Sequence, residues 1–153
     1  MSGQRGRPPR LSNIFIAEPI YFITFCTWRK TPLLACCAVA DAFRQSAREI
    51  GIHTVVVGKY VIMPDHIHCF VRVGREGRIG LAIKALKRAI TKEIHTFQRD
   101  KHVWQEGFFD HLLRSSESYS EKWEYVRANP VRAGLVERVE EWPFQGEVEN
   151  IRW

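Results

Sequence analysis

The segment MPDHIHCFVRV, residues 63–73, places two histidines one residue apart in an otherwise apolar stretch that is typical of a β-strand. Alternate side chains of a strand share a face, so His66 and His68 are expected on one side and Ile67 and Cys69 on the other. Two imidazoles at this separation can chelate one divalent ion. A single strand histidine is usually structural, and it is the His-Ile-His alternation that favours a metal site.

A helix expected over residues 118–129 carries a phenol and an amide that could complete such a site. Its apolar stripe consists of Tyr119, Trp123 and Val126. Tyr125 lies off that stripe, and Asn129 follows one helical turn later on the same face. If this face packs over the histidine strand, both groups reach the imidazoles. Spacing alone slightly favours a simpler interpretation, in which Tyr125 is a surface tyrosine and Asn129 a helix C-cap.

Three segments together resemble the single-tyrosine HUH transposases, most closely the REP-associated tyrosine transposases. They are VIMPDHIHCFVRV (61–73), WQEGFFDHLLR (104–114) and YVRANPVRAGLVERVEEWPF (125–144), within a resemblance that runs over residues 19–146. The combination of His-hydrophobic-His with Tyr-x-x-x-Asn-Pro-Val-x-x-Gly is far more specific than either half.

The resemblance implies a role for each residue that matches the family pattern. His66 and His68 would bind one Mg²⁺ or Mn²⁺, and Asn129 would complete that site. Tyr125 would be the nucleophile that cleaves single-stranded DNA near hairpin-forming palindromes. Its attack would give a covalent 5′-phosphotyrosine, so strands could be rejoined without ATP. His111 and Glu124 are candidates to assist, although a structural role explains each of them more simply.

Charge favours an anionic partner. The net charge is +6 and the pI is near 9.4. Residues 72–92 carry seven basic side chains and one acid, whereas residues 137–153 carry five glutamates and two arginines. This asymmetry suits nucleic acid along one side of the molecule, although a solvated helix face also explains any single patch. The resemblance implies that the partner is single-stranded or hairpin DNA. The candidates for phosphate contacts, each also explained by ordinary surface charge, are Lys59, Arg114, Arg127 and Arg132.

Hydrophobic periodicity predicts the elements that must position these residues. Strands are expected over 19–28, 53–63, 66–73 and 107–114, and helices over 36–50, 79–97 and 118–129. This order predicts an α+β fold: a ferredoxin-like β-α-β-β-α-β antiparallel sheet with an additional C-terminal helix that carries the tyrosine. Helices would cover one face of the sheet, and the other face would be free.

Local signals set the expected limits of the helices. Gly51 is expected to end the first helix, and the apolar stripe of the second extends through Phe97. On that second helix Lys84, Arg88 and Lys92 fall opposite the stripe. A capping box formed by Ser118 and Glu121 would open the third helix, and Pro130 would end it.

The chain divides into a basic irregular arm, residues 1–18, and one catalytic domain, residues 19–153. The arm contains RGRPPR, which includes the core of an AT-hook and equally suits a disordered basic tail. It lacks the continuous apolar region of a signal peptide, and no apolar run approaches a membrane span, so cytoplasmic residence is expected. The four cysteines Cys26, Cys36, Cys37 and Cys69 show no C-x-x-C spacing and are expected to be reduced core residues.

Three other functions remain open from the sequence. A non-catalytic RNA-recognition-type module shares the ferredoxin-like architecture, but imidazoles occupy the positions where its aromatic residues belong. A relaxase or replication initiator would generally be longer. An inactive, domesticated transposase is the third alternative. The closer resemblance favours a monomer, with a dimer that exchanges its tyrosine helices as the alternative.

Overall fold

The computed structural model describes residues 18–99 and 102–153, so the predicted basic arm lies outside the described residues except for Glu18. Five strands form one antiparallel sheet with the order β4-β1-β3-β2-β5. They are β1 (Ile20–Cys26), β2 (Val55–Ile62), β3 (His66–Val73), β4 (Phe109–Leu112) and β5 (Gln145–Glu147).

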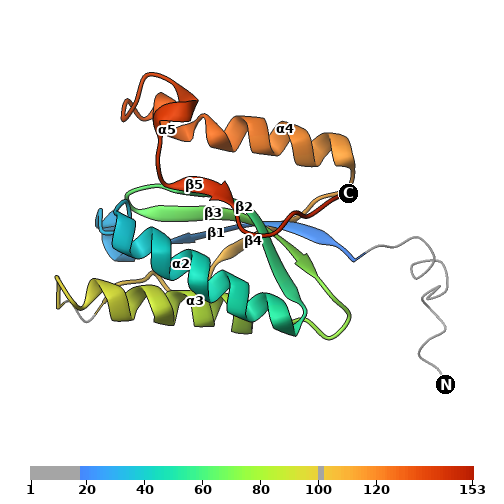
Figure 1. Ribbon diagram of the computed structural model, residues 1–153, viewed down its shortest axis with the longest axis horizontal. Helices are drawn as coiled ribbons and strands as arrows, with labels where there is room; N and C mark the ends of the chain where they lie inside the picture. The colour runs from blue at the N-terminus through green and yellow to red at the C-terminus, as the bar shows by residue number, and fades with distance from the viewer. Residues whose placement is uncertain (1–17, 100–101) are drawn as a thin grey trace.

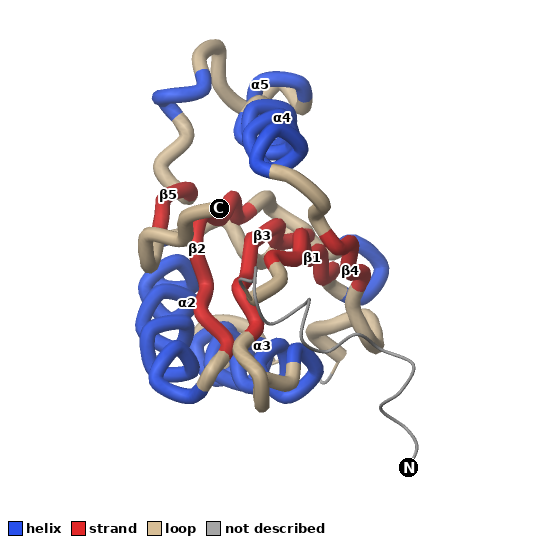
Figure 2. Tube along the Cα trace, turned by 90° about the vertical axis from the view of Figure 1, so that its right-hand side faces the viewer, coloured by secondary structure: helices blue, strands red, loops and turns tan. Residues whose placement is uncertain are grey.

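Helices lie on both faces of this sheet (Figures 1 and 2). The α-helices are α2 (Cys37–Ile50), α3 (Ile79–Ile94), α4 (Ser116–Arg127) and α5 (Asn129–Arg132). Short 3-10 helices are η2 (Trp28–Lys30), η3 (Gly51–His53) and η4 (Val139–Glu141). Helices α2 and α3 pack on one face, and α4 lies over the other (Figures 1 and 2). The element order and the strand order β4-β1-β3-β2 confirm the predicted ferredoxin-like α+β fold.

The main hydrophobic core lies between the sheet and helices α2 and α3. Alternation along β1 directs Ile23 and Phe25 into this core, where both are fully buried. The stripe of α3 meets them from Ile83 to Ile94, as the periodicity predicted. This packing fixes which face each strand residue occupies, and it therefore directs the intervening residues of β1 and β3 to the other face.

The prediction that the other face is free is wrong over its centre, because α4 packs there. Phe70 of β3 is on that face and is fully buried. Tyr119 and Trp123 of α4 cover it, with ring centroids 4.9 and 6.2 Å from that of Phe70. The helix that carries Tyr125 is therefore docked on the same face as the histidines.

Three helix limits differ from those predicted. Helix α3 ends at Ile94, and Phe97 lies beyond it and is 54% exposed. Helix α4 begins at Ser116 because Ser115 and Ser118 form the capping box, in which each side chain accepts from the other residue's backbone N–H, at 3.0 and 3.2 Å. The helix ends at Arg127, and Pro130 instead lies in the first turn of α5, where it has no helical N–H to lose.

Two further differences concern residues with weak sequence signals. Strand β5 was not predicted, because its three residues QGE show no apolar alternation, yet it pairs with the edge of β2. Helix α2 does end at Ile50, but Gly51 keeps a right-handed φ of −62°, and the left-handed residue of this turn is Thr54, with φ +99°.

All four cysteines are free thiols, as predicted, but only Cys69 is buried; Cys37 is exposed, so it is not a core residue. Among the described residues, none of the helices combines the length and the apolar character that a membrane span requires.

Candidate active site

The tight turn between β2 and β3 fixes the start of the histidine strand. The Met63 N–H donates to the carbonyl of His66 at 2.8 Å, which closes the turn at Pro64-Asp65 as predicted. The buried Thr27, just after β1, donates to the Asp65 carbonyl from its backbone N–H at 2.9 Å, and its hydroxyl lies 3.1 Å from the same oxygen and 2.8 Å from the Thr31 carbonyl. The turn is thus held to the neighbouring strand, and His66 has a defined position.

The two imidazoles lie together on the α4 face of the sheet. Their ring centroids are 4.7 Å apart. The Nδ1 of His66 is 2.7 Å from a carboxylate oxygen of Asp65, and the Nδ1 of His68 is 2.8 Å from the Thr24 hydroxyl. With both Nδ1 atoms engaged, Nε2 of each ring is the nitrogen that can bind an ion.

The environment keeps His68 neutral. Burial, the neighbouring His66 and the positive charges of Lys122 and Arg132 lower the pKa of His68 to about 3. The ring also stacks on Phe22, with centroids 5.1 Å apart and an interplanar angle of 23°. A neutral imidazole retains the lone pair that a metal ligand needs, so this environment favours ion binding.

His66 and His68 supply only two ligands for a divalent ion. The group that completes the site would have to be something other than a carboxylate or a thiol. Among the residues that the structure describes, no three His, Cys, Asp or Glu side chains cluster in a metal-binding arrangement. The amide of Asn129 is the predicted third donor. Two imidazoles and one amide oxygen would leave open coordination positions, which is the pattern of a catalytic rather than a structural site.

Tyr125 presents an exposed phenol near the end of α4. Its side chain is 62% exposed, as its place off the apolar stripe predicted. The guanidinium of Arg132 lies 3.8 Å from the centroid of its ring and donates to the Tyr125 carbonyl at 2.7 Å. Arg132 also donates to the side-chain oxygen of Asn129. A single arginine therefore connects the two α4–α5 residues that the sequence selected.

Packing places this end of α4 beside the histidine strand. Val126 is buried against Val61, Met63 and Trp142. Val61 is the β2 partner of His68 in the sheet register. The charge of Arg132 reaches His68, since it contributes to the lowered pKa of that ring. Tyr125, the residue before Val126, thus belongs to the same end of the same face.

The other predicted site residues lie in different surroundings. The Lys59 ammonium lies over the rings of Tyr119 and Trp123, 5.7 and 5.3 Å from their centroids. Arg127 donates to Glu124 at 3.2 Å, so these two form a surface pair on α4. Arg114 is exposed beyond β4, and the exposed His111 is the β4 partner of Phe22.

Sequence reasoning missed three side chains of the site. Asp65 and Thr24 hold the imidazoles, and Lys122 lies over the ring of Phe22 at 5.1 Å. The position of Asp65 directly before His66 was a usable signal. Thr24 could not be identified, because its role depends on the register in which β1 pairs with β3.

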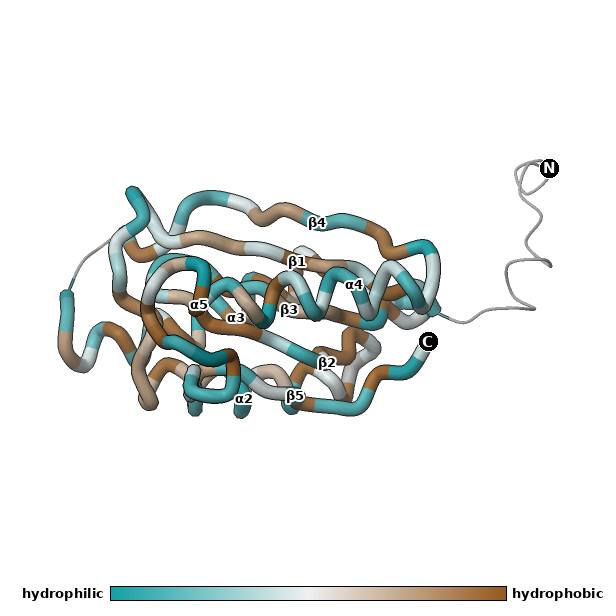
Figure 3. Tube along the Cα trace, turned by 90° about the horizontal axis from the view of Figure 1, so that it is seen from above, coloured by the Kyte–Doolittle hydropathy of each residue, from teal (hydrophilic) through white to brown (hydrophobic). Residues whose placement is uncertain are grey.

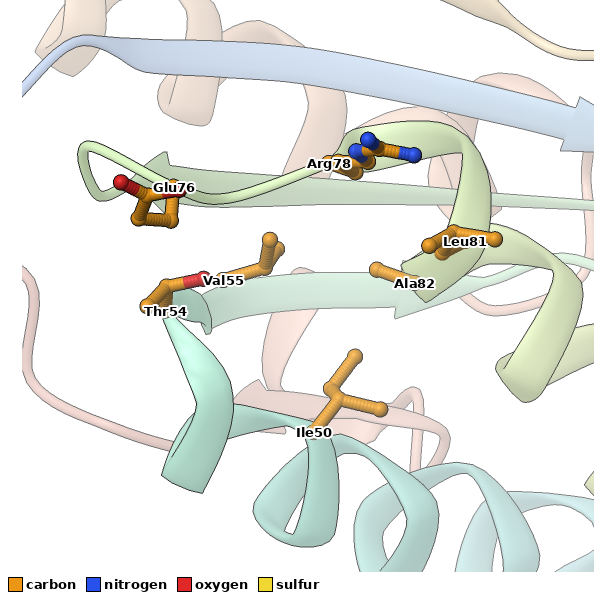
Figure 4. A pocket seen from close by; sticks show the side chains of 7 residues that line it. All are labelled: Ile50, Thr54, Val55, Glu76, Arg78, Leu81 and Ala82. Atoms are coloured by element: carbon orange, nitrogen blue, oxygen red, sulfur yellow. The ribbon is translucent and has the colours of Figure 1, made fainter.

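A cavity of about 320 Å³, shown in Figure 4, is lined by residues other than those of this site. Its lining consists of Ile50, Thr54, Val55, Glu76, Arg78, Leu81 and Ala82. Val55 pairs with Val73 at one end of the β2–β3 hairpin, whereas the histidines begin at the other end, beside Ile62. The cavity is therefore separate from the candidate active site.

Comparison with known proteins identifies the family of the chain. The family model described as "Transposase IS200 like" matches residues 18–129. A provisionally named REP-associated tyrosine transposase from Haemophilus influenzae is 29% identical over 115 residues, which cover 68% of this chain and 64% of the relative. The REP-associated tyrosine transposase of Escherichia coli is 31% identical over 88 residues, or 58% of this chain and 52% of the relative. The chain thus spans between half and two thirds of the length of these two relatives.

Solved structures show the same fold. A REP-associated tyrosine transposase bound to a REP hairpin matches with a TM-score of 0.66 and 24% identity, over 95% of this chain and 82% of that one. A provisionally named transposase from Deinococcus radiodurans matches with a TM-score of 0.53 and 19% identity, over 82% of this chain and 95% of that one. The resemblance predicted from the sequence is confirmed, and the chain belongs to the IS200-like transposase family.

Proposed function

We propose that this protein is a metal-dependent endonuclease and strand-transferase that acts on single-stranded DNA beside a hairpin. The observation that carries the proposal is the arrangement on the α4 face: two imidazoles whose Nδ1 atoms are engaged, and an exposed Tyr125 at the adjoining end of α4. Membership of the IS200-like transposase family supports this assignment. Hairpin DNA is proposed as the partner because the related structure of 24% identity contains a REP hairpin.

In this proposal Tyr125 is the nucleophile. Its phenolate oxygen attacks the phosphorus of a phosphodiester, the bond from phosphorus to the 3′ oxygen breaks, and that oxygen takes up a proton as a 3′-hydroxyl. The 5′ phosphate stays on the tyrosine, and attack by another 3′-hydroxyl reverses the step. The guanidinium of Arg132 packs against the ring of Tyr125, 3.8 Å from its centroid, and so helps to hold the nucleophile in place.

His66, His68 and Asn129 would hold Mg²⁺ or Mn²⁺. The bound ion would act as a Lewis acid that orients and polarises the phosphodiester. Asp65 and Thr24 hold the two rings so that both Nε2 atoms are available on one face. Arg132 and Lys122 are placed to balance the phosphate charge near His68, since both charges reach that ring.

The proposal is tested by incubating the protein and Mg²⁺ with a labelled hairpin oligonucleotide that carries single-stranded flanks. An SDS-resistant adduct is expected with the unmodified protein and not with Tyr125→Phe. Tyr119→Phe is the matched control, because Tyr119 lies on the same helix and its buried hydroxyl has no hydrogen-bond partner among the described residues. An adduct that persists in Tyr125→Phe, or its absence from a folded, metal-loaded protein, would refute the proposal.

A further inference from the structure

Phe109 is a large apolar side chain that the sheet leaves in solvent. It is the first residue of β4 and is 61% exposed. Strand β4 pairs with β1 and is an edge of the sheet. Burying a phenyl ring is ordinarily favourable, so a ring left outside on a rigid strand is available to a partner.

The sheet register places Phe109 in line with the candidate metal ligands. Phe109 is the partner of Thr24, and Thr24 is the partner of His68. Directly opposed residues of antiparallel strands share a face, so the three side chains form a row across three strands. Two strand spacings amount to about 10 Å, a span of the order of one or two nucleotides.

Helix α4 does not cover this row at its outer end. Figure 3 looks down on α4 and shows the helix running along the strand direction above the centre of the sheet, with β4 outside it at the edge. The exposed His111 lies two residues along the same strand, on the same face. A strip of open sheet therefore leads from the histidines to the edge at Phe109.

Positive charge borders the strip. The Lys122 ammonium lies over Phe22, the partner of His111, and the exposed Arg114 follows the end of β4. The carboxylate of β4, Asp110, pairs with the buried Ile23 in the register and so belongs to the other face. An aromatic ring beside cationic side chains is the usual combination for single-stranded nucleic acid, in which bases stack and phosphates are neutralised.

We propose that Phe109 is a stacking platform for a base of single-stranded DNA next to the phosphate held at His66 and His68. This inference rests on the proposed function and identifies where the strand leaves the site: across β1 and over the β4 edge. Stacking tolerates any base, so Phe109 would contribute affinity and alignment without reading sequence.

The test measures binding without cleavage, in the Tyr125→Phe background with Mg²⁺ present. The probe is a fluorescein-labelled 12-nucleotide single strand, followed by anisotropy, alongside an oligonucleotide of equal length with abasic sites throughout. Phe109→Ala is expected to weaken binding of the base-containing strand about tenfold, and Phe109→Trp to preserve it. Both variants should bind the abasic strand as the parent does.

Phe97→Ala is the matched control, because Phe97 is similarly exposed, at 54%, but follows α3 on the opposite face. It should leave binding unchanged. The inference would be overturned if Phe109→Ala and Phe97→Ala bound the base-containing strand with equal affinity. It would also be overturned if Phe109→Ala weakened binding of the abasic strand as much as binding of the base-containing strand. A molar mass that falls in Phe109→Ala by light scattering would also overturn it, since a second copy of the chain would then cover the ring. These results do not depend on the adduct assay, so failure of either proposal can be recognised separately.

Discussion

The two imidazoles of the candidate site are held by different partners. Asp65 reaches His66 from the adjacent position in the chain, whereas Thr24 reaches His68 from the neighbouring strand. Each contact fixes a ring orientation in which Nε2 is directed away from the protein partner. The proposed metal affinity therefore depends on residues that would not themselves touch the ion.

Replacing Thr24 by valine tests this positioning role. The variant keeps the shape of the side chain but loses the hydroxyl, so we expect Mn²⁺ to bind about tenfold more weakly or worse. Thr24→Ser restores the hydroxyl and should restore the affinity. The measurement is isothermal titration of the metal-free protein with Mn²⁺, which requires no DNA cleavage. Equal affinity of Thr24→Val and the unmodified protein would contradict the role.

His68 should make the metal-free protein sensitive to acid. Its pKa is about 3 in the folded state, chiefly through burial, against the usual value near 6.5 in an unfolded chain. Between these values the unfolded state binds a proton that the folded state excludes. The contribution of His68 is therefore fully present above about pH 6.5 and is lost as the pH falls towards 3, at up to about 1.4 kcal/mol per pH unit.

The free energy of unfolding, from urea denaturation at pH 7.0 and 5.0, measures this effect. We expect His68→Gln to reduce the loss of stability between these two pH values. His111→Gln is the control, because His111 is exposed on the edge strand and should leave the loss unchanged. If the unmodified protein, His68→Gln and His111→Gln all lost the same free energy of unfolding between the two pH values, burial of His68 would not make the protein sensitive to acid.

At the scale of elements, the site depends on how α4 begins and docks. The helix starts at a reciprocal cap between Ser115 and Ser118, and it ends where Val126 packs into the cluster with Val61, Met63 and Trp142. The Trp142 indole donates to the carbonyl of Ile62 at 3.0 Å, which ties the returning chain to β2. Tyr125 is thus carried on a helix fixed at both ends.

The start of α4 allows a test between the observed capping box, Ser115 with Ser118, and the box predicted from sequence, Ser118 with Glu121. Ser115→Ala should lower the free energy of unfolding by about 1 kcal/mol, because the Ser118 N–H loses its acceptor. Glu121→Ala, at the position of the box predicted from sequence, should change it by less than about 0.5 kcal/mol. Urea denaturation of the two variants decides this, and a larger effect from Glu121→Ala would contradict the observed cap.

Sequence patterns predicted the elements with strong periodicity and missed those that depend on tertiary pairing. The apolar stripe of α3 and the alternation of β3 were sufficient to place both elements. Strand β5 has no such pattern and exists because the edge of β2 offers unpaired backbone groups. Docking of α4 on the sheet could not be derived from spacing either, since Tyr119 and Trp123 predict only that some surface covers that side of the helix.

At the scale of the whole molecule, one face of the sheet forms the hydrophobic core and the opposite face carries the candidate active site. Helices α2 and α3 bury its structural face, and α4 covers part of the opposite face while leaving the β4 edge open. Strand alternation predicted that His66 and His68 share a face, whereas the role of Tyr125 was implied by the family resemblance, because helix spacing alone favoured a surface tyrosine. That these faces meet is a property of the folded molecule, and Arg132 and Val61 are the residues that connect them.

The central claim, that Tyr125 forms the covalent bond to DNA, is tested most directly by locating the adduct. The four tyrosines fall on four different tryptic peptides, and Tyr125 is the only tyrosine of the peptide WEYVR, residues 123–127. After reaction with the hairpin oligonucleotide and Mg²⁺, digestion with nuclease and trypsin should leave a nucleotide phosphate on that peptide in mass spectrometry. A modification on the peptide of residues 115–122, which carries Tyr119, or on any tyrosine other than Tyr125, would contradict the account.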